Sequence, residues 1–118
     1  MNERSLKISA YEEPDRYVLT LSGELDMSGA QAFEDAAMRL CEMGASELLI
    51  DISEVGFIDS TGIRAILAVK ASCEQRSCEF SMTHGRESVD HLFELTRLID
   101  RLTFRSRNRE QPRREIAL

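Results

Sequence analysis

The sequence is poor in the residues that build disulfide scaffolds and membrane spans. Its 118 residues include three cysteines, two prolines and no tryptophan, and aromatic residues make up 6%. An odd, small number of cysteines cannot form a complete disulfide framework, so we expect free thiols in a reducing compartment. No apolar run reaches the roughly 18 residues that a membrane span needs, and the first residues lack the apolar core of a secretory signal. The composition therefore predicts a cytoplasmic protein that does not enter a membrane.

Positive charge is scarce as well, except near the C-terminus. The formal net charge is −6 at pH 7, and an acidic body excludes a nucleic-acid-binding domain, which needs a basic face. The exception is a group of arginines at positions 101, 105, 107, 109, 113 and 114. We expect residues 1–105 to form one domain and residues 106–118 to form a flexible arginine-rich tail, because no apolar periodicity continues after Phe104.

The apolar residues alternate between two periods along the chain. Period-two or continuous apolar segments predict strands, and three-and-four spacing predicts amphipathic helices. Strands are expected around residues 6–10, 17–21, 48–52, 78–82 and 102–104, and helices around residues 27–43, 63–75 and 89–99. The turn residues 12–15 should join the first two strands as a hairpin. This order predicts an α/β sandwich, with a mixed, mainly parallel sheet of four to five strands packed by three to four helices.

One short motif breaks the local rules for helices. In Asp59-Ser60-Thr61-Gly62, the first two residues are common helix caps, but glycine in a first turn weakens a helix by about 1 kcal/mol. Such a glycine indicates that a ligand or another chain approaches the backbone closely. Ser60 would lie at the positive end of a helix dipole, a position that tolerates a phosphate group. A capping serine with no further role is the alternative.

The wider pattern resembles the STAS domain family, and in particular the bacterial anti-sigma factor antagonists, over about residues 5–105. The resemblance rests on four segments: Gly23-Glu24-Leu25-Asp26, Leu49-Ile50-Asp51-Ile52, the stretch from Phe57 to Ile63, and Leu92-Phe93-Glu94-Leu95-Thr96.

The resemblance implies a regulatory switch at Ser60. The unphosphorylated protein would bind an anti-sigma factor with serine/threonine kinase activity and free a sigma factor. Phosphorylation of Ser60 would break the complex, and a serine phosphatase would reset it. The implied partner-binding residues are Asp26, Asp59, Ser60, Thr61, Gly62 and Ile63.

The sequence departs from the family pattern in three places. Related proteins often have glycines where this chain has Cys73-Glu74-Gln75-Arg76-Ser77, and they usually have a glycine at the position of Arg97. The final helix that is typical of the family is not evident in residues 105–118.

Two other functions fit parts of the sequence. A stand-alone STAS subunit can assemble with a transporter or another signalling complex, with no sigma factor involved. A small serine hydrolase would need a glycine two residues before its nucleophile, where this chain has Ile58, and His84 and His91 are the only candidate bases. We therefore expect a binding protein without enzymatic activity or cofactor.

The sulfur-containing residues are expected to be structural. Cys73 and Cys78 are five residues apart, which does not match a compact zinc motif, and Cys41 and Cys78 fall on apolar faces. We therefore expect core thiols and no metal. The methionines at positions 27, 38, 43 and 82 are expected in or near the core.

Overall fold

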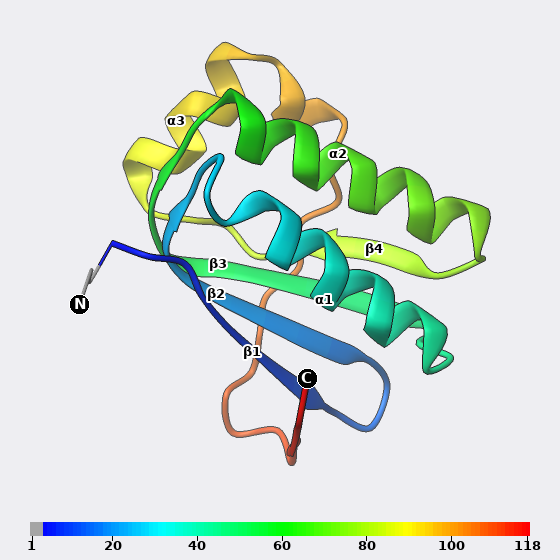
Figure 1. The fold of residues 1–118 in the computed structure, drawn as a ribbon. Coiled ribbons are helices and arrows are strands. Elements are labelled where there is room, and N and C mark those ends of the chain that lie inside the picture. The colour runs from blue at the N-terminus through cyan, green and yellow to red at the C-terminus, as the bar shows by residue number, and fades with distance from the viewer. Residues whose placement is uncertain (1–3) are drawn as a thin grey trace.

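The structure, a computed structural model, describes residues 4–118 and contains a five-stranded sheet and three α-helices (Figure 1). In chain order the elements are β1 (Lys7–Glu12), β2 (Tyr17–Leu25), α1 (Ala30–Glu42), β3 (Glu47–Ile58), α2 (Ser60–Gln75), β4 (Glu79–Met82), α3 (Glu87–Leu95), the short 3-10 helix η1 (Leu98–Asp100) and β5 (Arg114–Ile116).

The sheet is mixed, as expected. Its strand order is β4-β3-β2-β1-β5, in which β1 and β2 form an antiparallel hairpin and β2, β3 and β4 run parallel. The helices α1 and α2 connect successive parallel strands and lie side by side over one face of the sheet (Figure 1). Because parallel strands end at the same edge, the segments that follow β2 and β3 meet there. The predicted α/β sandwich is confirmed.

The main core lies between the sheet and the helices. In β3, Ile50 and Ile52 belong to this core, whereas Leu49 and Asp51 point to the opposite face because side chains alternate along a strand. Leu49 and Asp51 are nevertheless buried, so the second face of the sheet is also covered at this place.

The C-terminal segment provides cover on that second face, and this differs from the expected flexible tail. The Arg107 side chain is buried and forms ion pairs with Asp51 (3.0 Å) and with Glu13 (3.5 Å). Residues 114–116 then form β5, which pairs antiparallel with β1 and buries Ile116. The expected strand at 102–104 is reduced to one isolated bridge between Phe104 and Met82. Apolar periodicity could not predict that this segment packs on the domain. Its contacts are made by a buried arginine and a three-residue strand, and neither produces an apolar pattern in the sequence.

The third helix is shorter than its apolar stripe predicts. It ends at Leu95, and Arg97 adopts φ 61°, in the left-handed region that interrupts an α-helix. Ser77, in the turn after α2, has φ 57°. Both residues occupy segments where the STAS resemblance leads one to expect glycine. Within residues 4–118, no helix combines the length and the apolar character that crossing a membrane would require.

Candidate partner-binding site

Ser60 is the first residue of α2 and lies exposed where the chain turns from β3 into the helix. The preceding Asp59 is the N-cap, and its Oδ1 accepts a hydrogen bond from the Gly62 N–H at 2.9 Å. The carboxylate therefore satisfies one of the free donors of the first turn. Asp59 does the capping, which leaves the Ser60 hydroxyl free of that role.

Gly62 has a different purpose from the one that the sequence suggested. It is buried, and a Cβ atom at this position would lie 2.2 Å from the Leu25 carbonyl oxygen and 2.9 Å from Cγ2 of Ile58. The missing side chain lets α2 begin directly against the end of β2. The close approach is therefore made within the domain, by the Leu25 carbonyl at the end of β2. Thr61 and Ile63 are half-buried.

The end of β2 is joined to this turn. The Asp59 N–H donates to the Leu25 carbonyl at 3.3 Å. Asp26 directly follows Leu25 and Ser60 directly follows Asp59, so this hydrogen bond brings the two segments together. Asp26 does not cap α1, whose N-cap is Gly29. Its Oδ1 instead accepts from the Ser28 hydroxyl (2.7 Å) and the Ser28 N–H (3.0 Å), and these hydrogen bonds hold the pKa of Asp26 below its usual 3.8. Asp26 therefore adds a carboxylate to the surface beside Ser60.

Two exposed apolar side chains flank these residues. Met27 is 79% exposed on the loop after β2, and Phe57 is 48% exposed near the end of β3, opposite Glu24 of β2. The expectation that Met27 and Met43 fill the core is wrong, because both are exposed. An exposed large apolar side chain beside a candidate site is a candidate for contact with a partner. The sequence contained a signal for the exposure of Met27, because Met27 directly follows Asp26, one of the predicted partner-binding residues.

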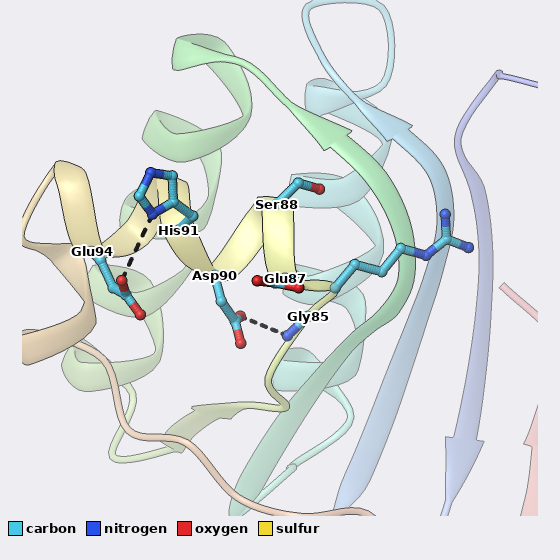
Figure 2. A pocket seen from close by; sticks show the side chains of 7 residues that line it. Gly85, Glu87, Ser88, Asp90, His91 and Glu94 are labelled. Atoms are coloured by element: carbon cyan, nitrogen blue, oxygen red, sulfur yellow. Dashed lines mark hydrogen bonds and ion pairs between the residues drawn. The ribbon is translucent and has the colours of Figure 1, made fainter.

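An open hollow of about 1030 Å³ lies along α3 (Figure 2). Its lining residues are Gly85, Arg86, Glu87, Ser88, Asp90, His91 and Glu94. Figure 2 shows the Asp90 carboxylate directed toward the Gly85 N–H, which donates to it at 2.8 Å. Arg86 connects this hollow to β3, because its guanidinium lies 3.5 Å from the Glu54 carboxylate.

The two histidines also belong to this region. His84 lies 3.2 Å from the Asp90 carboxylate and stacks on Phe104, and His91 lies 3.8 Å from the Glu94 carboxylate. Both imidazoles thus interact with carboxylates of α3 rather than with the turn that carries Ser60.

The groups that could hold a metal lie elsewhere. Within residues 4–118, the single cluster of suitable ligands is formed by Cys41, Cys73 and Cys78, toward the opposite end of α2 from Ser60.

The chain was compared with models of known protein families. The family model described as "Mlab, STAS domain" matches residues 8–103. The chain belongs to the STAS domain family.

Several similar proteins are described as anti-sigma factor antagonists. The anti-sigma-B factor antagonist of Staphylococcus epidermidis is 23% identical over 96 residues, covering 81% of this chain and 89% of that protein. The crystal structure of an anti-sigma factor antagonist from Mycobacterium paratuberculosis has a TM-score of 0.77 at 23% identity, covering 89% of this chain and 90% of that one. The anti-sigma factor antagonist SpoIIAA in its unphosphorylated form has a TM-score of 0.68 at 18% identity, covering 86% and 89%. The same protein from Bacillus in the phosphorylated form has a TM-score of 0.62 at 17% identity, covering 86% and 92%.

Proposed function

We propose that this STAS domain is an anti-sigma factor antagonist. In its unphosphorylated form it binds an anti-sigma factor that is also a serine/threonine kinase, and it thereby releases a sigma factor. Phosphorylation of Ser60 ends this binding. The observation that carries the proposal is the exposed Ser60 at the start of α2, with the exposed side chains of Met27 and Phe57 on the adjoining segments.

The physical basis of the switch is the charge that phosphorylation adds. A phosphate group brings close to two negative charges to a surface that already carries Asp59 and Asp26. In the free protein this charge is tolerated, because it lies at a helix N-terminus and one turn from the exposed Arg64. In an interface that covers Met27 and Phe57, the same charge would lose its water, and burying an unpaired charge is costly. Binding and phosphorylation are therefore mutually exclusive.

The relatives support the same assignment. They are described as antagonists of anti-sigma factors, and SpoIIAA is described in both an unphosphorylated and a phosphorylated form. We infer that the present protein acts in the cytoplasm by binding and catalyses no reaction itself. A serine phosphatase would return Ser60 to its active state.

The phosphorylation test uses an anti-sigma factor kinase that co-purifies with this protein, together with ATP and mass spectrometry of the product. We expect one phosphate, on Ser60. Ser60→Ala should abolish its incorporation, and the matched variant Thr61→Ala should retain it, because Thr61 is half-buried and β-branched. Phosphate on another residue would contradict the proposed switch.

The binding test separates the roles of charge and apolar contact. Ser60→Ala should bind the kinase as the wild type does, whereas Ser60→Asp should weaken binding at least about tenfold, or about 1.4 kcal/mol. Met27→Ser and Phe57→Ser should also weaken binding. Met43→Ser is the control, because Met43 is exposed at the end of α1 away from Ser60. Equal affinities for wild type and Ser60→Asp would favour the alternative of a subunit in a transporter assembly.

A further inference from the structure

The fold brings together three cysteines that are far apart in the sequence. Cys41 lies in the last turn of α1, Cys73 in the last turn of α2, and Cys78 just before β4. The Sγ atoms of Cys41 and Cys73 are 3.6 Å apart, and all three Sγ atoms lie within 4.8 Å of one another. The side-by-side packing of α1 and α2 produces this cluster, so the spacing of the cysteines along the chain could not predict it.

The turn after α2 places the third thiol. Arg76 ends the helix, and Ser77 adopts a positive φ of 57°, which turns the chain back on itself. The Cys78 N–H then donates to the Cys73 carbonyl oxygen at 2.8 Å. This turn holds the Cys78 side chain against the end of the helix, beside the other two thiols.

The sulfur separations suit one ion held by three thiolates. A metal–sulfur bond is about 2.3 Å long, so an ion in the plane of three sulfurs places them about 4.0 Å apart. The Sγ–Sγ distances in this protein, 3.6 Å for one pair and at most 4.8 Å for the others, each differ from this value by less than about 1 Å.

The cluster also restricts the kind of ion. Within the described part of the chain it holds no fourth thiol, imidazole or carboxylate, and none of its three residues is more than 8% exposed. Zinc normally takes four ligands, so here it would need a water molecule in a site with little access to solvent. Thiolate ligands also select monovalent copper, a soft ion that three sulfurs can satisfy.

We propose that Cys41, Cys73 and Cys78 form a three-coordinate binding site for a monovalent copper ion. The ion replaces the protons of the thiols and draws the ends of α1 and α2 together. Ser60 is thirteen residues before Cys73 on the same helix, a distance of about 20 Å along its axis. Copper binding therefore leaves the surface around Ser60 open.

The test is an anaerobic titration of the full chain with Cu(I) in competition with a chromophoric chelator. We expect one ion per chain, and X-ray absorption of this wild-type complex should show three sulfur neighbours. A shell of two sulfurs, or no binding against the chelator, would overturn the proposal. Zinc titrated alone should not bind stoichiometrically, and stoichiometric zinc in place of copper would overturn the assignment of the ion.

Variants test each ligand separately. Cys41→Ala, Cys73→Ala and Cys78→Ala should each weaken copper binding by about 100-fold or more, since even changes around a ligand weaken metal binding by about 10–100-fold. The matched control is Met43→Leu, which removes an exposed thioether near the end of α1 and should bind copper as the wild type does. Thermal unfolding confirms that each variant is folded, and copper should raise the Tm of the wild type more than that of any cysteine variant. Unchanged affinity in any one of the three variants would overturn the three-thiol site.

Discussion

Gly62 shows how much a single residue determines about the candidate site. Its lack of a side chain allows α2 to start against the Leu25 carbonyl, and this contact fixes the position of Ser60 relative to Asp26. The close approach that the glycine in this motif allows is made by the Leu25 carbonyl of the same domain. Helix propensity shows that glycine is unfavourable in the first turn of a helix, but it does not show which atoms would contact a side chain at that position.

Ser77 and Arg97 are the non-glycine residues with positive φ among residues 4–118. The left-handed conformation costs an ordinary residue about 1–2 kcal/mol relative to its preferred backbone. We therefore expect Ser77→Gly and Arg97→Gly each to increase the free energy of unfolding by up to about 1 kcal/mol, measured by urea denaturation.

The matched control for Arg97→Gly is Arg101→Gly. Arg101 is also exposed and ends η1, but its φ is −102°. Glycine there relieves no strain and adds flexibility to the unfolded chain, so it should leave the protein unchanged or slightly less stable. A loss of stability in Arg97→Gly as large as that in the control would show that the left-handed backbone carries no strain.

At the scale of elements, β5 is a short strand that completes the sheet. It covers the free edge of β1 and buries Ile116, whose burial contributes about 1.5–3 kcal/mol. We expect truncation after Ser106, which also removes Arg107, to lower the Tm by about 10 °C or more, as measured by circular dichroism. Removing only Ala117 and Leu118, which are exposed, is the control and should leave the Tm unchanged. A truncated chain that melts within a few degrees of the full chain would restore the expectation of a flexible tail.

The strands and helices with strong periodicity were predictable, and the elements held by single contacts were not. β1 to β4 and α1 to α3 follow from apolar spacing, and the turn that carries Ser60 follows from its motif. β5 has one buried side chain in three residues, which no periodic pattern can reveal. Met27 and Phe57 were missed because apolar residues are assigned to the core unless the fold places them in a loop or at a strand end. The thiol cluster depends on the packing of two helices, which the sequence does not specify residue by residue.

At the scale of the whole molecule, buried ion pairs link the turn between β1 and β2 and the C-terminal segment to the middle of β3. Arg107 lies between Asp51 of β3 and Glu13 of the first turn, and Arg16 also pairs with Glu13 at 3.0 Å. Arg109 also lies 3.7 Å from Asp51, and Arg16 lies 3.6 Å from Glu47, so the network contains three positive and three negative side chains that neutralise one another. Removing one member would leave a buried charge without its partner, which costs about 3–5 kcal/mol.

Asp51 makes this network sensitive to acid. Burial alone would raise the pKa of Asp51, but hydrogen bonds from Ser53 and Arg107, together with the charge of Arg107, hold it below the usual 3.8. A carboxyl group whose pKa is lowered by folding stabilises the protein above its unfolded pKa, and this stabilisation is lost as the pH falls through the folded value. The contribution of Asp51 should therefore be complete above about pH 4 and should decline only at lower pH.

The variant Asp51→Asn isolates this effect, because all other carboxyl groups titrate in both proteins. At pH 7 we expect the variant to be less stable than the wild type by about 3 kcal/mol, since the amide cannot neutralise Arg107. The difference in the free energy of unfolding should stay constant from pH 7 to about pH 5. It should narrow as the pH falls below about 4, where the unfolded chain takes up the proton first, and down through the lower pKa of the folded carboxyl group. Urea denaturation at a series of pH values measures it. A difference that is the same at every pH would mean that Asp51 stabilises the fold through its shape and hydrogen bonds, and that its charge contributes nothing.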